Sequence, residues 1–132
     1  MATFLKRFAR ATGVSCTAIG VCHAAYGVRS VPGAVDANTT VDSRERFYGA
    51  MFAAYGLAWI AAARRSPVPA PAVRALAGAM ALGGVGRAVS LADRGGPHWF
   101  QNVLTAVEFA VPAAFLALAG SDERAVAEGA GS

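Results

Sequence analysis

Residues 99–119 read WFQNVLTAVEFAVPAAFLALA and contain a single charged residue, Glu108. About 20 apolar residues in a helix cover the roughly 30 Å of hydrocarbon in a lipid bilayer, so this stretch predicts a membrane-spanning helix. Three other largely uncharged runs have the same character, at 11–28, 47–63 and 73–91. The sequence therefore predicts an all-α integral membrane protein in which four transmembrane helices form one bundle.

Proline- and glycine-rich connections separate the last three of these runs. Residues 66–71 read SPVPAP, and alternating prolines cannot continue a helix. Residues 93–97 read DRGGP, which is typical of a tight turn. We expect residues 1–10 to be a basic cytoplasmic amino terminus and residues 120–132 to be a polar tail that frays. A single transmembrane domain over residues 11–119 lies between them.

The composition points to lipid around the helices. Of the 132 residues, 55% are hydrophobic and only 15% are charged, whereas soluble domains carry roughly 25% charged residues. A soluble alanine-rich bundle is the alternative, but it needs a polar face on every helix. The net charge is +4, yet the basic residues lie at the ends of apolar runs, so no nucleic acid partner is expected.

The distribution of basic residues predicts the orientation of the chain. Seven of them fall at the amino terminus, around the second connection and in the tail, namely Lys6, Arg7, Arg10, Arg64, Arg65, Arg74 and Arg124. Because basic residues favour the cytoplasmic side, we expect a multi-pass protein of the cell membrane with both termini in the cytoplasm. A cleaved signal peptide is the alternative for the first run, but an uncleaved helix is simpler because three further apolar runs follow.

Small residues predict where the helices pack closely. They recur at helical spacing in two runs, as Gly49, Ala53 and Gly56 and as Ala75, Ala79 and Gly83. In membranes, faces of this kind allow helix backbones to approach one another. Both faces are therefore expected to contact a neighbouring helix.

Glu108 is the polar residue that most needs an explanation, because it lies near the middle of the fourth run. Gln101, Thr105, Glu108 and Pro112 recur at steps of four, three and four, so they share one helix face. Pro112 also lacks the amide that would bond the Glu108 carbonyl. Two interpretations stay open, a structural ion pair or hydrogen-bonded carboxyl and a functional acid, base or proton carrier.

Arg87 is the expected partner of Glu108. It lies near the end of the third run, and its long side chain can reach toward Glu108 or extend outward to the lipid headgroups. We favour pairing. The candidate catalytic residues are Glu108 as acid or base, with Arg87 or Arg46 stabilising developing negative charge.

Aromatic and polar side chains are the candidates for a small-molecule pocket. An aromatic stripe on the second run is usually packing or a lipid belt, but facing inward it would form an apolar wall beside the charges. The candidate ligand-binding residues are His23, Tyr26, Tyr48, Tyr55, Trp59, Gln101 and Asn102. No metal site and no cofactor is expected, because Cys16 and Cys22 lie too far apart on one helix to pair and no set of ligands with metal spacing occurs.

The strings RERFYGAMFAAYGLAW (44–59) and ALGGVGRAVSLADRGGP (81–97), followed by VEFAVP (107–112), resemble a family of small four-helix bacterial membrane proteins known only as a domain of unknown function. The likeness covers about residues 13–118. The positions that carry it are Arg46, Phe47, Gly49, Gly86, Arg87, Gly96, Pro97 and Glu108. The resemblance implies a membrane architecture and supplies no activity.

Three functions follow as hypotheses. The first is a non-catalytic membrane protein that binds an amphipathic small molecule or serves as an accessory subunit of a partner membrane protein. The second is a membrane-embedded enzyme, such as an isomerase, cyclase or epoxide-opening catalyst, that acts on a lipid-soluble substrate through Glu108. The third is a proton-coupled exporter that works as a homodimer. It resembles the small multidrug transporters in outline but carries its glutamate in the fourth helix rather than the first.

Overall fold

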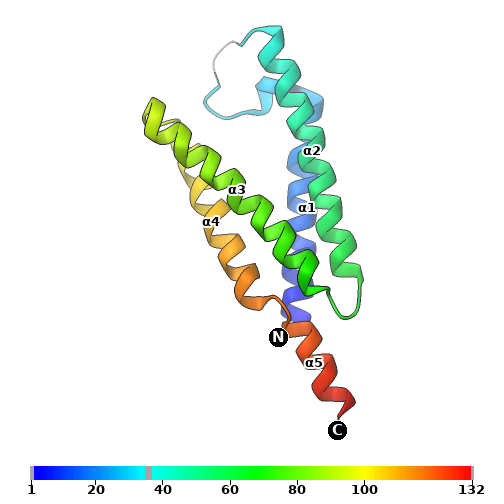
Figure 1. Cartoon of the computed structure of the whole chain (residues 1–132). Helices are drawn as coiled ribbons and strands as arrows, with labels where there is room; N and C mark the ends of the chain where they lie inside the picture. Colours follow the sequence, from blue (N-terminus) through cyan, green and yellow to red (C-terminus); the bar gives the residue numbers. More distant parts are fainter. Residues whose placement is uncertain (1, 35–36, 132) are drawn as a thin grey trace.

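The computed structural model describes residues 2–34 and 37–131, and within these ranges the chain contains helices and loops but no strand (Figure 1). Its elements in chain order are α1 (Ala2–Tyr26), the 3-10 helix η1 (Gly27–Ser30), α2 (Thr39–Arg64), α3 (Ala70–Arg94), α4 (Trp99–Leu118) and α5 (Ser121–Ala130). The all-α class predicted from the sequence is confirmed. Helix α1 includes almost all of the expected basic terminus, and α2 begins well before the expected residue 47.

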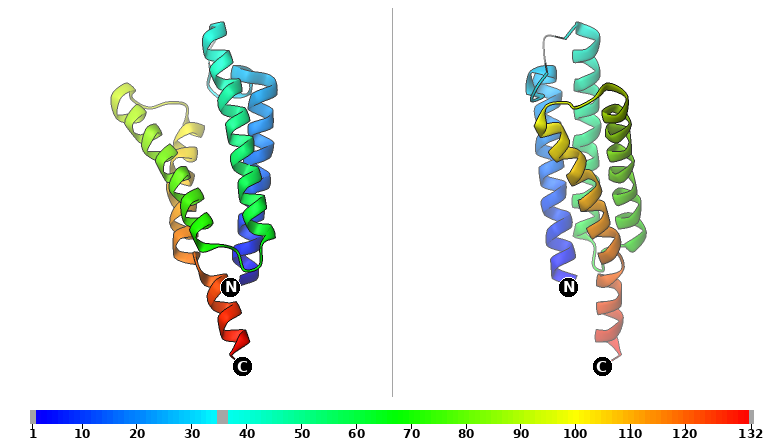
Figure 2. Two further views of the ribbon diagram at one scale, coloured as in Figure 1. Left: turned by 45° about the vertical axis from the view of Figure 1, so that its right-hand side comes forward. Right: turned by 90° about the vertical axis from the view of Figure 1, so that its left-hand side faces the viewer.

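The four long helices form two antiparallel hairpins. Helix α1 packs along α2, and α3 packs along α4 (Figures 1 and 2). The hairpins meet at the end of the molecule that holds both termini, and they diverge toward the other end (Figure 2, left). We call these the closed end and the open end. The molecule therefore has the four long helices that the sequence predicts, but they form an open pair of hairpins instead of one compact bundle.

Glycines hold α1 and α2 in backbone contact. Gly13 and Gly20 on α1 lie opposite Gly56 and Gly49 on α2, at heptad spacing on both helices. A Cβ at Gly13 would lie 2.7 Å from the Gly56 carbonyl oxygen, and a Cβ at Gly49 would lie 2.8 Å from the Gly20 carbonyl oxygen. No side chain fits at such distances, so the packing depends on glycine. Thr17 lies between the two glycines of α1, and its hydroxyl donates to the Gly13 carbonyl at 2.8 Å.

The two predicted small-residue faces have different outcomes. The face on α2 is the one that packs against α1. The face on α3 is exposed along its length, at Ala75, Ala79 and Gly83, and nothing lies within 4 Å of a Cβ placed at Gly83. Within the described chain no helix packs on this face, because α3 turns another row, which includes the buried Ala77 and Gly84, toward the rest of the molecule.

One apolar core lies where the two hairpins meet. Trp59 and Phe115 are completely buried there, with ring centroids 4.1 Å apart, and Phe8 stacks on Phe115 at 4.3 Å. Val68 and Val73 complete the contact with the start of α3. The core thus joins α1, α2, α3 and α4 at the closed end only.

Helix α5 occupies the region expected to be a frayed tail. After Gly120 turns the chain with φ +82°, Asp122 is only 5% exposed and its Oδ2 accepts from the Val68 amide at 2.6 Å. Glu123 Oε1 accepts from the Ala70 amide at 2.8 Å. The residue before α3 is a proline with no capping side chain, so Glu123 from α5 satisfies the first amide of α3, while Asp122 satisfies the amide of Val68 in the loop before it.

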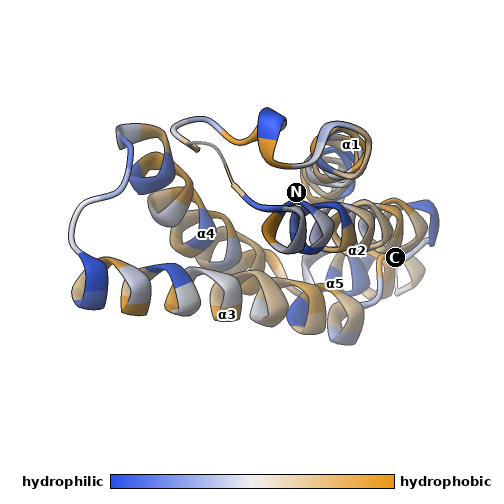
Figure 3. Cartoon of the chain, turned by 90° about the horizontal axis from the view of Figure 1, so that it is seen from above, coloured by the Kyte–Doolittle hydropathy of each residue, from blue (hydrophilic) through white to orange (hydrophobic). Residues whose placement is uncertain are grey.

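Two of the described helical segments are long and apolar enough to cross a membrane, α3 and the stretch Trp99–Ala130 that begins with α4. The sequence predicts four. Helices α1 and α2 have the length, but charged residues gather near their starts, as Lys6, Arg7 and Arg10 on α1 and as Asp42, Arg44, Glu45 and Arg46 on α2. Seen from above, apolar colouring follows much of each long helix and is not confined to the sides that face one another (Figure 3).

Candidate functional site

An ion pair joins the two helices of the second hairpin. Arg87 on α3 donates from Nε to both carboxylate oxygens of Glu108 on α4, at 3.0 Å to Oε1 and 2.9 Å to Oε2. The Glu108 side chain is 21% exposed and that of Arg87 is 39% exposed. The pairing that the sequence favoured is confirmed, and it lies halfway along α4.

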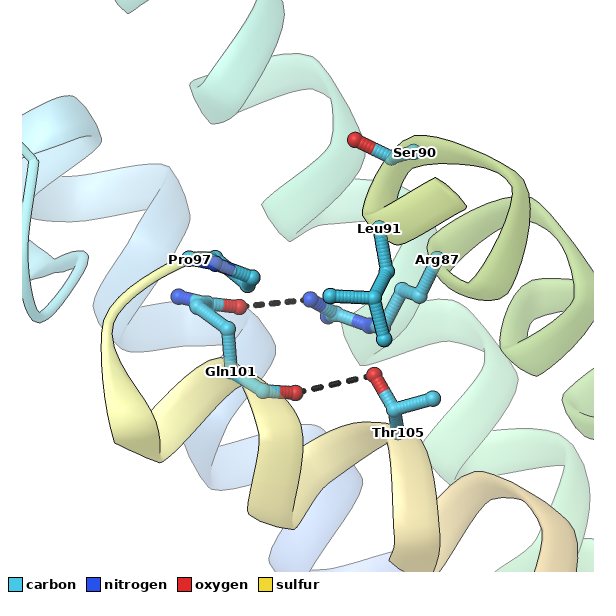
Figure 4. A pocket seen from close by; sticks show the side chains of 6 residues that line it. All are labelled: Arg87, Ser90, Leu91, Pro97, Gln101 and Thr105. Atoms are coloured by element: carbon cyan, nitrogen blue, oxygen red, sulfur yellow. Dashed lines mark hydrogen bonds between the residues drawn. The ribbon is translucent and has the colours of Figure 1, made fainter. Parts of the chain in front are cut away.

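Gln101 extends this pair into a chain of hydrogen bonds. Its Oε1 accepts from Arg87 Nη1 at 2.6 Å, and its Nε2 donates to the carbonyl of Pro32 at 3.4 Å, in the loop that follows η1. The Thr105 hydroxyl donates to the Gln101 carbonyl at 2.9 Å (Figure 4). The chain therefore connects α3, α4 and the loop between α1 and α2 at the open end of the molecule. We call Arg87, Glu108, Gln101 and Thr105 the polar cluster.

The sequence explains why these side chains meet. Gln101, Thr105 and Glu108 follow one another by four and three positions on α4, so they form one row along that helix. Opposite this row, a Cβ added at Gly84 would lie 3.2 Å from the Glu108 Cβ, so glycine lets α3 approach closely. Arg87 lies one turn beyond Gly84 and reaches both Glu108 and Gln101. The shared face predicted for α4 is present.

A cavity of about 240 Å³ opens beside the polar cluster. It is lined by Arg87, Ser90, Leu91, Pro97, Gln101 and Thr105 (Figure 4). Sequence reasoning missed Ser90, Leu91 and Pro97 as site residues. A signal was present for two of them, since Ser90 and Leu91 follow Arg87 by three and four positions and so share its helix face.

Arg46 belongs to a different site at the end of α1. Its Nη1 donates to the carbonyls of Ala24 and Ala25, at 3.1 and 2.6 Å, and its Nε donates to Asp42 Oδ2 at 2.8 Å. The last carbonyls of a helix lack partners within the helix, and a guanidinium stabilises them. The structure thus gives Arg46 a capping position, and none of its hydrogen bonds in the described ranges reaches Glu108.

Asp42 completes this cap. The hydrogen bond from Arg46 and a second one from the Val28 amide, at 3.0 Å, lower the pKa of the Asp42 carboxyl. The carboxylate comes so close to the chain at Gly27, where φ is +57°, that a Cβ there would collide with it. This requirement for glycine fixes the turn from α1 into η1.

Two aromatic residues of α2, Tyr55 and Trp59, pack at the closed end of the molecule. The Tyr55 hydroxyl donates to the Leu76 carbonyl at 2.6 Å, and its ring lies edge-to-face with Trp59 at 6.4 Å. Trp59 stacks on Phe115, which lies seven residues and about 10 Å along α4 from Glu108. Trp59 therefore belongs to the core, and Tyr55 joins α2 to α3.

The remaining predicted ligand-binding residues are not bonded to the cluster. Tyr26 and Tyr48 are 63% and 57% exposed, and Asn102 is also exposed. His23 is partly buried on α1, where its backbone lies against Gly49. In the part of the chain that the structure describes, no hydrogen bond or ion pair joins any of these four residues to Arg87 or Glu108. Of the seven predicted ligand-binding residues, Gln101 alone is bonded to the ion pair.

The described residues also contain no group of three or more histidine, cysteine, aspartate or glutamate side chains that could hold a metal ion. Both cysteines are free thiols on α1. Cys16 is buried against α2, and Cys22 is exposed.

Comparison with known proteins gives one match. Residues 4–119 match the model of a family described as "Domain of unknown function (DUF4345)". The match includes α1 to α4 and the polar cluster, and it ends just before α5. No curated protein and no solved structure matches the chain.

Proposed function

The chain belongs to the DUF4345 family, and from this premise we propose that it is a small integral membrane protein that binds an amphipathic small molecule at the polar cluster. Residence in the membrane and binding at Arg87 are supported by separate features of the molecule.

Support for membrane residence comes from where the apolar side chains lie. In the most apolar 18-residue stretch of α3, only 11% is buried, and in that of the segment Trp99–Ala130 only 22% is buried. The core helix of a soluble protein is, by contrast, mostly buried. Large hydrophobic side chains are exposed on all four long helices, for example Ile19, Leu57, Leu82 and Phe109. Exposing such an extensive apolar surface to water is unfavourable, whereas contact with lipid tails is not. We therefore infer that all four long helices lie in the bilayer.

The binding proposal depends on one nitrogen of the Arg87 guanidinium that has no hydrogen-bond partner among the described residues. Its Nε bonds Glu108 and its Nη1 bonds Gln101, while Nη2 has no partner among the described residues. This nitrogen belongs to a side chain that lines the cavity together with Ser90 and Thr105. A guanidinium donor that borders a cavity and lacks an acceptor is a recognition group for a carbonyl, carboxylate or phosphate oxygen.

The size of the cavity indicates which kind of molecule fits. Pockets that enclose a whole drug-sized ligand measure roughly 300 to 1,000 Å³, and this cavity of about 240 Å³ is smaller. It suits a polar head group, with the apolar remainder of the ligand lying along the exposed apolar faces of α3 and α4. Amphipathic molecules have this shape.

The enzyme and exporter hypotheses rank below binding. Both require Glu108 to exchange a proton during function. Both carboxylate oxygens already accept hydrogen bonds from Arg87, so the carboxyl is occupied by a structural contact. A structural ion pair that presents a free donor fits the geometry better than an acid or base.

The test is purification in mild detergent followed by mass spectrometry of co-purifying small molecules, for the wild type and for Arg87→Lys. Lysine keeps the positive charge but lacks the planar guanidinium with its several fixed donors. We therefore expect the amount of co-purifying amphiphile to fall at least about tenfold. The matched control is Arg94→Lys, since Arg94 is 84% exposed and pairs only with its neighbour Asp93. Equal recovery from the wild type and Arg87→Lys, with the protein folded in both, contradicts binding at Arg87.

A further inference from the structure

A second concave surface lies at the opposite end of the molecule from the polar cluster. A groove of about 620 Å³ runs between the end of α2 and the start of α3. Its walls are mostly small apolar side chains, including Ala58, Ala61 and Ala72, with Leu76 deeper along α3 and Arg65 at its edge. The groove exists because the row of alanines leaves a trough between two helices that a short proline-rich loop holds together.

The charge around this groove is unbalanced. Arg64, Arg65 and Arg74 are all exposed, and no side-chain hydrogen bond or ion pair of theirs occurs within the ranges that the structure describes. The carboxylates of Asp122 and Glu123 accept hydrogen bonds from the amides of Val68 and Ala70, and in the described part of the chain neither forms an ion pair with these arginines. The groove is therefore an apolar trough with a cationic edge.

We infer that this groove binds an anionic phospholipid, with an acyl chain along the alanine trough and the phosphate at Arg64 and Arg65. The inference rests on the membrane residence proposed above and is independent of binding at Arg87. An apolar trough whose cationic edge lies at the end of the helices matches the two chemical parts of such a lipid at the depth where its headgroup lies. A second copy of this chain fits less well, because a symmetric contact would bring the same unpaired arginines together.

The experiment measures lipid binding to the full chain in detergent by native mass spectrometry, with phosphatidylglycerol and phosphatidylcholine of identical acyl chains and with free glycerol phosphate. We expect phosphatidylglycerol to bind more tightly than phosphatidylcholine, and glycerol phosphate to bind poorly. Each lost arginine is expected to weaken phosphatidylglycerol about fivefold, so Arg65→Gln loses about fivefold and the double variant Arg64→Gln/Arg65→Gln about 25-fold. Arg94→Gln, at the other end of α3, is the matched control and is expected to bind as the wild type.

A second variant separates the groove from a general attraction to positive charge. Ala61 is exposed in the groove wall, so Ala61→Phe fills the trough without removing charge or disturbing the core. We expect it to weaken phosphatidylglycerol as strongly as Arg65→Gln. Equal binding of the two lipids, wild-type binding by Ala61→Phe, or tight binding of glycerol phosphate alone would each overturn the inference. None of these outcomes affects the Arg87→Lys test, whereas a chain that stays in solution without detergent would contradict both proposals.

Discussion

At the scale of single residues, the two arginines chosen from the sequence as catalytic candidates have different surroundings. Arg87 bonds Glu108 and Gln101, while Arg46 bonds the carbonyls that end α1. The position of Glu108 in an apolar run predicted that it needs a partner, because an ionised group in a membrane span rarely stands alone. The role of Arg46 was not predictable in this way, since the carbonyls it caps lie more than twenty positions away in the sequence.

The first prediction concerns how the cap formed by Asp42 and Arg46 makes the stability of the fold depend on pH. The folded pKa of Asp42 is lowered from the model-peptide value of 3.8 by its hydrogen bonds from Arg46 and Val28. A group whose pKa is lower in the folded state stabilises the fold above its unfolded pKa, and this contribution is lost as the pH falls through the folded pKa. We expect Asp42→Asn to lower the melting temperature at pH 7 and to remove the part of the acid destabilisation below about pH 4 that comes from this cap.

Thermal unfolding in detergent, followed by circular dichroism between pH 7 and pH 2, measures this effect. The control is Asp93→Asn, because Asp93 is 74% exposed and pairs only with the adjacent Arg94. An Asp42→Asn variant with the same pH dependence as the wild type would show that the cap is not formed.

At the scale of helices, the glycines of α2 and most of those of α3 have different surroundings. On α1 and α2 it brings two backbones into contact, whereas at Gly78, Gly83 and Gly86 of α3 an added Cβ meets nothing within 4 Å. The sequence pattern is similar in both places, so it could not show which face would find a partner within the chain.

This difference gives the second prediction. A Cβ at Gly20 would overlap the Ala53 backbone, and overpacking of this kind costs about 1 to 3 kcal/mol. We therefore expect Gly20→Ala to reduce the free energy of unfolding by that amount, measured by denaturant titration in mixed micelles. Gly83→Ala is the matched control and is expected to be neutral or to stabilise by up to about 1 kcal/mol, because alanine favours the helix. Equal losses in both variants would contradict the packing of α1 on α2.

Helix α5 illustrates what local sequence leaves undecided. Its composition, SDERAVAEGA, is polar, and a short isolated helix is marginal in water. It is held by tertiary contacts instead, through Asp122 and Glu123 on the loop before α3 and on the first turn of α3. Only the fold brings those amides to the tail.

At the scale of the whole molecule, both termini lie at the closed end (Figure 1), whereas Gln101 of the polar cluster bonds the Pro32 carbonyl in the loop at the open end. If all four long helices cross a bilayer, the number of crossings is even and both termini lie on the same side. The distribution of basic residues favours the cytoplasmic side, since the closed end carries the larger share.

Topology is therefore the third prediction. We expect reporter tags at the amino and carboxyl termini to be protected in intact cells and a tag inserted between Gly95 and Gly96 to be accessible from outside. The insertion site is exposed and an added side chain there meets no neighbour, so the tag is not expected to disturb folding. Termini on opposite sides would contradict four crossings, and extraction of the chain by alkaline carbonate would contradict membrane residence.

The sequence by itself determined the helical class, the approximate positions of the four long helices and the row of polar residues on α4, because these depend on apolar length, proline positions and helical spacing along a single segment. The tertiary structure alone decided that the molecule opens into two hairpins, that Gln101 reaches the Pro32 carbonyl, and that α5 caps α3. These features depend on distances between segments far apart in the chain. Local patterns specify which residues share a face, whereas the choice of the partner for each face is made by packing, at the glycines of α1 and α2 and at the rings of Trp59 and Phe115.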